Sequence, residues 1–184
     1  LGISAFREGT LNKSILNRWS SDLGTLDLRV IKFDSNDKIK LKDINIYSEL
    51  YNMHFDTLDL RECNSDIIRI DGCDFNTLIL PRNCKDFYIS SRNNIPKIVI
   101  SSSSIRLSGW TWRRDSHINI YSDGIIIYDG YGEIFEGEIH CAGLVISDIR
   151  RVDTLQHTTF FVKDRECYDK YLPVLGENGL KLEE

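Results

Sequence analysis

The sequence has no long apolar run. Its longest ones, such as "IIIY" at 125–128, are far too short to cross a bilayer. It also has no basic stripe, and with 23 basic and 28 acidic residues its net charge is −5. Nucleic acid is therefore not an expected partner. The 184 residues, 41% of them hydrophobic and 28% charged, fit one ordinary globular domain.

Metal-ligand motifs are absent as well. No CxxC motif occurs and no two of the four histidines stand at ligand spacing, so the sequence predicts no zinc site and no cofactor. The five cysteines are Cys63, Cys73, Cys84, Cys141 and Cys167. Because an odd number cannot all pair, they favour buried, reduced thiols and lean weakly towards a reduced compartment. The chain begins at Leu1 and its only methionine is Met53, so we expect a trimmed product.

What the sequence does contain is a repeat of about 20 residues. Pairs of apolar residues separated by one position return at steps of 20 residues (58 to 78, 78 to 98, 98 to 118) and then 21 (118 to 139). The pairs are Leu58 and Leu60, Leu78 and Leu80, Ile98 and Ile100, Ile118 and Ile120, and Ile139 and Cys141. Ile39 with Leu41, and Phe160 with Val162, extend the same phase at either end.

Each unit carries a second alternating pair. These pairs are Ile44 and Ile46, Ile68 and Ile70, Phe87 and Ile89, Ile105 and Leu107, Ile125 and Ile127, and Leu144 and Ile146. Alternation of period two predicts half-buried strands, and two strands per 20 residues describe one turn of a coil. Stacked coils bury their inward faces together, so we predict a β-solenoid of six to seven coils, of leucine-rich-repeat or β-helix type. An antiparallel sandwich also uses short strands, but it has no reason to keep a 20-residue phase.

The ends of the chain depart from the repeat. We expect one domain, residues 1–184, with an N-terminal cap over 1–24, repeats over 25–162 and a C-terminal cap over 163–184. Residues 1–24 have apolar positions closer to helical than to strand spacing. In the C-terminal cap, an i, i+3, i+4, i+7 pattern predicts an amphipathic helix that starts near Asp164, ends around Pro173 to Gly176 and closes the last coil. The residues of that pattern are Tyr168, Tyr171, Leu172 and Leu175. A short strand, "GLKLEE" (179–184), is then expected to pair with that edge.

Two segments resemble a known family. "FNTLILPRNCKDFYIS" (75–90) resembles the strand-proline-strand repeat of BspA-like leucine-rich-repeat proteins, and "TTFFVKDRECYDKYLPVLGENGLKL" (158–182) is similar to their closing unit. The family repeat is usually longer and carries a Gly-x-x-Ala-Phe segment, of which "SAFREGTL" (4–11) is the one echo here. The resemblance implies a binding or adhesion module displayed on the cell surface or secreted, without a catalytic site.

Outward-facing residues would carry any chemistry. On the first wall they are Lys40, Asp59, Ile79, Val99, Asn119, His140 and Phe161, and on the second Asn45, Arg69, Tyr88, Arg106, Ile126 and Val145. A polysaccharide-cleaving solenoid needs two carboxylates roughly 5–10 Å apart, which strands about 4.8 Å apart would supply from neighbouring coils. Asp59 has only Lys40 and Ile79 beside it, and no Ser, Cys or Asp neighbours His140. The pattern therefore predicts no catalytic residue.

Two outward features favour binding. The first is the corner formed by Trp110, Trp112, Arg113 and Arg114, since aromatic and arginine side chains dominate contact surfaces. The second consists of apolar residues that follow one another on neighbouring coils, Ile79 with Val99 and Ile126 with Val145. Such a patch is expected either to be covered by loops or to contact another chain. A tryptophan folded over the solenoid edge is the structural alternative for the corner. The acidic corner at 129–138 matches no calcium-loop pattern.

From these features we expect a non-enzymatic binding or adhesion module that recognises a protein or glycan partner and is capable of self-association. One alternative is a degenerate β-solenoid hydrolase or lyase acting on polysaccharide. Another is a structural module of a larger assembly, with this chain as its terminal part.

Overall fold

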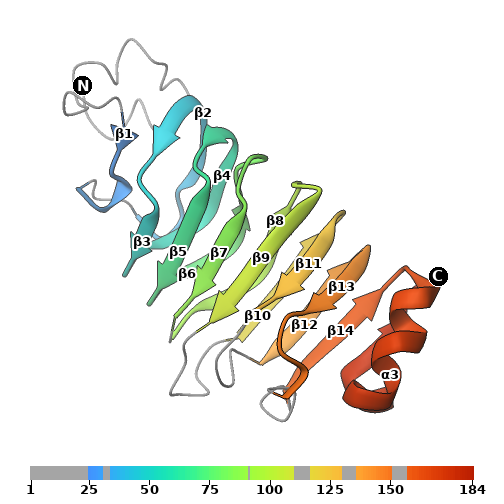
Figure 1. The fold of residues 1–184 in the computed structure, drawn as a ribbon. Helices are drawn as coiled ribbons and strands as arrows, with labels where there is room; N and C mark the ends of the chain where they lie inside the picture. The colour runs from blue at the N-terminus through green and yellow to red at the C-terminus, as the bar shows by residue number, and fades with distance from the viewer. Residues whose placement is uncertain (1–24, 31–33, 91, 110–116, 130–135, 151–156) are drawn as a thin grey trace.

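The computed structural model describes residues 25–30, 34–90, 92–109, 117–129, 136–150 and 157–184. In these residues the chain forms two parallel sheets that face each other across one core (Figure 1). The nine-stranded sheet comprises, in spatial order, β1 (Thr25–Leu26), β2 (Lys38–Ile46), β4 (His54–Asn64), β6 (Asp74–Ile79), β8 (Asn94–Ile100), β10 (His117–Ser122), β12 (Gly137–Cys141), β14 (Thr158–Val162) and β15 (Leu180–Leu182). The six-stranded sheet comprises β3 (Glu49–Tyr51), β5 (Ile67–Asp71), β7 (Asp86–Ile89), β9 (Ser104–Gly109), β11 (Ile125–Tyr128) and β13 (Gly143–Ile146).

From β2 to β13 the chain alternates between the two sheets, and each strand pairs in parallel with strands one coil away. One strand on each wall makes one coil. The predicted β-solenoid with two strands per coil and a helical C-terminal cap is confirmed.

The core consists of rows of apolar side chains that run along the solenoid. On one wall Leu78 lies in register between Leu58 and Ile98, and all three are fully buried. On the other wall Phe87 lies between Ile68 and Leu107, again fully buried. The alternation seen in the sequence thus separates side chains that fill the core from side chains that face solvent.

The phase of the repeat is shifted by two residues at β10. Ile120 lies beside both Ile98 and Ile139, whereas Ile118 pairs with Ile95. The prediction that Ile118 continues the row of Ile98 is therefore wrong. The cause is a register irregularity between Ile118 and Ile120, which the constant period does not reveal.

Two further assignments are corrected by the strands. Ile44 and Ile46 are buried but belong to β2 of the nine-stranded sheet, so the second strand of that coil is the short β3. Ile126 points inward rather than outward, because β11 buries Ile126 and Tyr128 and exposes Ile125. In four consecutive apolar residues either alternation is compatible with the sequence, and register with Leu144 places Ile126 inside.

The C-terminal cap begins with α3 (Arg165–Gly179), whose N-cap Asp164 accepts a hydrogen bond from the Glu166 amide at 2.9 Å. Gly176, at φ 71°, interrupts the helix close to its predicted end. The chain then enters β15, which pairs with β14 as expected. The expected N-terminal cap, residues 1–24, lies outside the described residues. The described part begins with β1 and a 3₁₀ turn, η1 (Leu28–Val30).

Helix α3 also covers the edge strand of the six-stranded sheet. The amide of Leu144 in β13 donates to Sγ of Cys167 at 3.1 Å, and this thiol donates to the Leu144 carbonyl at 3.3 Å. The amide of Ile146 donates to the hydroxyl of Tyr171 at 3.1 Å. Side chains of one helix thereby pair backbone groups that a further strand would otherwise pair.

Candidate functional site

One continuous row of uncharged or aromatic side chains lies on the outside of the nine-stranded sheet. We call Ile79, Val99, Tyr121, His140 and Phe161 the outer row, because successive members are register partners in adjacent strands. Ile79 and Val99 are adjacent and half-buried, as the sequence predicts. Asn119 does not belong to this row. The irregularity in β10 puts Tyr121 in its place.

The three rings of the outer row are stacked. The centroids of Tyr121 and His140 are 4.9 Å apart at an interplanar angle of 14°, and those of His140 and Phe161 are 4.4 Å apart at 7°. Beyond Phe161, the ammonium group of Lys181 lies 5.5 Å from the ring centroid. Parallel strands set this spacing, since neighbouring side chains at equal positions repeat at about 4.8 Å. The stack therefore covers the ring faces and presents ring edges to solvent.

Both ring nitrogens of His140 are occupied. Nδ1 lies 3.0 Å from a carboxylate oxygen of Glu183, and Nε2 lies 3.2 Å from a carboxylate oxygen of Glu138. A catalytic histidine needs a nitrogen free to take or give a proton at the substrate. Among the described residues, Glu183 and Glu138 hold the imidazole in the stack, and each ring nitrogen already has a carboxylate as its partner.

Asp59 continues the row towards the N-terminus and has the predicted neighbours, Lys40 on one side and Ile79 on the other. Its carboxylate accepts a hydrogen bond from the Arg61 amide at 3.0 Å and lies 3.7 Å from the Arg61 guanidinium. The carboxylate of Asp59 is thus held by Arg61 of the same strand.

The tryptophan–arginine corner (Trp110, Trp112, Arg113, Arg114) lies outside the described residues, as does much of the acidic corner at 129–138. Of that acidic corner, Asp129 lies 3.9 Å from Arg106. Among the described residues, no three His, Cys, Asp or Glu side chains are placed to hold a metal ion.

All five cysteines are free and buried. Burial raises the pKa of Cys63, Cys84 and Cys141 to about 12 and that of Cys73 to about 11, and it raises the pKa of Cys167 as well. Thiolate is the nucleophilic form of cysteine, so these side chains act as core residues.

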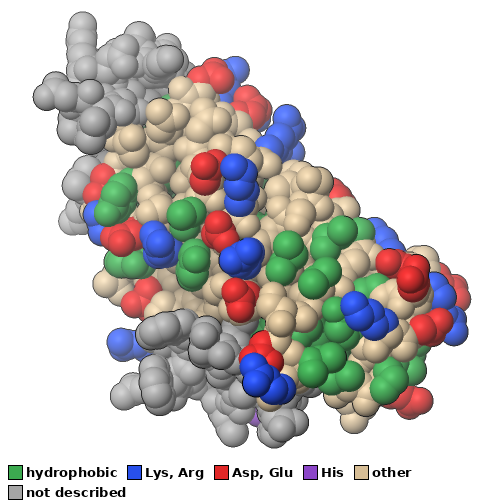
Figure 2. Space-filling view, viewed as in Figure 1, with side chains coloured by type: hydrophobic (Ala, Val, Ile, Leu, Met, Phe, Trp, Pro, Cys, Tyr) green, Lys and Arg blue, Asp and Glu red, His purple; other side chains and the backbone are tan. Residues whose placement is uncertain are grey.

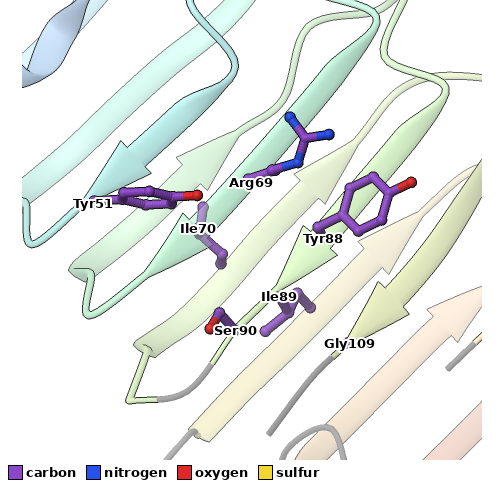
Figure 3. Close-up of a pocket in the computed structure, with 7 residues that line it drawn as sticks. All are labelled: Tyr51, Arg69, Ile70, Tyr88, Ile89, Ser90 and Gly109. Atoms are coloured by element: carbon purple, nitrogen blue, oxygen red, sulfur yellow. The ribbon is translucent and has the colours of Figure 1, made fainter. Parts of the chain in front are cut away.

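A pocket of about 380 Å³ lies at the carboxyl ends of β3, β5, β7 and β9 (Figure 3). Its lining residues are Tyr51, Arg69, Ile70, Tyr88, Ile89, Ser90 and Gly109. Figure 3 shows Arg69 between the rings of Tyr51 and Tyr88, with the buried Ile70 and Ile89 beneath. The guanidinium carbon of Arg69 lies 5.0 Å from the Tyr88 ring centroid, and one guanidinium nitrogen donates to the Ser48 hydroxyl at 3.3 Å.

Tyr51 keeps its hydroxyl proton in this setting. Burial raises its pKa, the nearby Glu49 and Asp71 raise it further, and Arg69 partly opposes them. Its phenol is therefore a hydrogen-bond donor throughout the ordinary pH range.

Hydrophobic side chains are concentrated in one part of the face shown in Figure 2. On the face shown in Figure 2, acidic and basic side chains are interspersed over the N-terminal part, and hydrophobic side chains gather towards the C-terminal helix. Ile127 and Val145 are register partners in the C-terminal part of the six-stranded sheet, and Val145 is 42% exposed. The second apolar patch predicted from the sequence thus contains Ile127 in place of Ile126.

Sequence reasoning missed the pocket and the carboxylates around His140. Tyr51 lies in a three-residue strand that buries only Leu50, so no alternating apolar pair marks it. Glu138 could have been found, since it stands two positions before His140 on the same strand face. Glu183 could not, because it follows a strand that begins only after α3.

Comparison with known proteins gives no relative: no family model, curated protein or solved structure matches this chain. None of the helices in the described residues combines the length and the hydrophobicity that a transmembrane helix requires.

Proposed function

We propose that this protein is a non-enzymatic binding module and that the outer row contacts a protein partner. The observation that carries the proposal is the row itself, in which five successive strands present Ile79, Val99, Tyr121, His140 and Phe161 in hydrogen-bonded register. Backbone pairing fixes these side chains before any partner arrives, which reduces the entropy lost on binding.

The composition of the row favours a protein over a glycan at this surface. Sugar rings pack on exposed aromatic faces, whereas here stacking covers the ring faces and leaves their edges. Apolar and aromatic side chains at the centre with charged residues at the ends is the arrangement of protein interfaces. Lys40 and Asp59 lie at one end of the row and Lys181 at the other, and the carboxylates of Glu138 and Glu183 flank the row at His140.

Two local arrangements support a non-enzymatic role. Both ring nitrogens of His140 are engaged by carboxylates, and Asp59 is bonded within its own strand. Membership in the BspA-like family, and with it a surface-displayed adhesion role, is the part of the proposal that rests on the resemblance of segments 75–90 and 158–182 alone.

The test is a binding screen against extracellular matrix proteins and glycans, followed by affinity measurements on variants. Val99→Lys places a charge in the row, and Tyr121→Ala removes one ring of the stack. Val145→Lys, on the opposite sheet, is the matched control, and Trp112→Ala tests the corner predicted from the sequence. We expect at least about tenfold weaker binding for the two row variants and no change for the control.

Sedimentation velocity on the same variants tests whether the partner is a second copy of the chain. If the wild type binds nothing on the screen and does not self-associate, or if folded row variants bind as the wild type does, the outer row is only scaffold.

A further inference from the structure

The pocket on the six-stranded sheet is separate from the outer row and contains one charged side chain, Arg69. Its volume of about 380 Å³ falls within the usual range for small-ligand sites, about 300–1,000 Å³. Apolar side chains form its base, and its polar groups are two phenols, a serine hydroxyl and a guanidinium. A mostly apolar cavity with few converging polar groups is typical of ligand-binding sites.

Arg69 differs from the other arginines around this sheet. Arg29 forms ion pairs with Asp27 at 2.8 Å and Glu49 at 2.6 Å. Arg106 lies between two carboxylates at 3.8 and 3.9 Å. Among the described residues Arg69 has no acidic partner, and only the Ser48 hydroxyl accepts from its guanidinium.

The neighbouring acids do not supply the missing partner. Glu49 is the register partner of Arg69 but is bonded to Arg29. Asp71 lies two residues further along β5 on the same face and beside Tyr51 in register, but it forms no ion pair with Arg69 and is not among the lining residues. The guanidinium therefore keeps donors free for an anion that enters from solvent.

The two tyrosines narrow the class of ligand. Their rings flank Arg69, whose guanidinium lies over one face of the Tyr88 ring, and the rest of their ring surface offers an apolar wall to a ring-shaped molecule. Their hydroxyls and that of Ser90 can bond to sugar hydroxyls. Gly109 adds no side chain at the β9 end. A guanidinium fork matches a carboxylate, with two parallel hydrogen bonds.

We propose that the Tyr51–Arg69–Tyr88 pocket binds a saccharide residue that carries a carboxylate. Arg69 holds the carboxylate, the tyrosine rings pack against the sugar ring, and the hydroxyls of Tyr51 and Ser90 bond to its hydroxyls. This site lies on the opposite sheet from the outer row, so it can be tested independently of a protein partner.

The experiment is calorimetric titration of the full chain with three ligands: a galacturonic acid trisaccharide, the matched neutral galactose trisaccharide, and acetate. We expect the acidic trisaccharide to bind at least about tenfold more tightly than either of the others. Arg69→Gln should weaken its binding by about tenfold or more, because a charged hydrogen-bond pair is lost. The control, Arg106→Gln, removes an arginine of the same sheet and should change affinity by less than about twofold.

Thermal melts establish that each variant is folded. If Arg69→Gln does not fold, Arg69→Lys takes its place, since it retains the charge but loses the fork and should still weaken binding. The proposal is overturned if the wild type shows no heat at about 10 mM acidic trisaccharide, or if acetate or the neutral sugar binds equally well. Unchanged affinity in the folded Arg69 variant would overturn it too. None of these outcomes bears on the outer row, which is tested by Val99→Lys.

Discussion

Replacing Tyr171 by phenylalanine removes one hydroxyl and nothing else from the helix that covers β13. In the wild type that hydroxyl accepts a hydrogen bond from the Ile146 amide at 3.1 Å. Tyr171 is 2% exposed, so water cannot easily take its place. A buried amide left without an acceptor costs about 1–3 kcal/mol.

That cost gives a measurable shift. For a chain of 150–250 residues, 1 kcal/mol lowers the melting temperature by about 2–4 °C, so Tyr171→Phe should melt about 2–12 °C below the wild type. Cys167→Ala should lower it as well, because the Leu144 amide and carbonyl both lose their partner. Urea titration followed by circular dichroism gives the free energies directly.

The matched control is Tyr168→Phe, three residues earlier on the same helix. Tyr168 is half-buried, its ring contacts the Arg165 guanidinium at 5.6 Å, and no described group bonds to its hydroxyl. Its loss should change stability by less than about 0.5 kcal/mol. If Tyr171→Phe and Tyr168→Phe are equally mild, helix α3 does not seal the sheet edge through this hydrogen bond.

Four shorter predictions follow from other parts of the fold. Leu78→Asp should lose at least about 3 kcal/mol, while Ile79→Asp on the outside should lose far less; equal losses in a urea titration would contradict the inward–outward assignment. Gly124→Ala should lower the melting temperature, because a Cβ there would lie 2.4 Å from the carbonyl oxygens of Ser102 and Ser103; an unchanged melt would mean that the two coils can separate. The free energy of unfolding should fall between pH 9 and about 12, because the Cys84 thiol ionises near its ordinary pKa of 9.0 in the unfolded chain but only near 12 in the folded one. In a pH series of urea titrations, Cys84→Ala should reduce this decrease by up to about 1.4 kcal/mol per pH unit. Incubation with neutral or acidic polysaccharide should release no reducing ends, and turnover lost in His140→Ala would show that the protein is an enzyme.

The repeat could be predicted from the sequence because each apolar pair carries its own period-two signal, and the C-terminal helix because Tyr168, Tyr171, Leu172 and Leu175 follow helical spacing. Leu78 and Phe87 are assigned correctly on that basis alone. The signal fails where neighbouring residues are equally apolar. In "IIIY" at 125–128 one alternation buries Ile125 and Ile127 and the other buries Ile126 and Tyr128, and register with adjacent coils decides for the second.

The candidate sites were harder to predict because they depend on the pairing of particular strands. The sequence predicts that Val99 and His140 face outward in one row, but it does not predict that Tyr121 lies between them. A local irregularity in β10 puts Tyr121 at the position expected for Asn119. The pocket gathers residues from four coils around Arg69. No local pattern indicates that this arginine, unlike Arg106, forms no ion pair with a described carboxylate.

The five buried thiols provide a set of probes placed along the solenoid axis. Cys63 lies in an early coil, Cys141 in a late one and Cys167 in the cap, so a reagent that alkylates thiols reports where the structure opens. In stacked repeats each coil contacts only its neighbours, and opening begins at the ends more readily than in the middle. Mass spectrometry of the alkylated peptides would therefore map, without any added label, the order in which the coils separate.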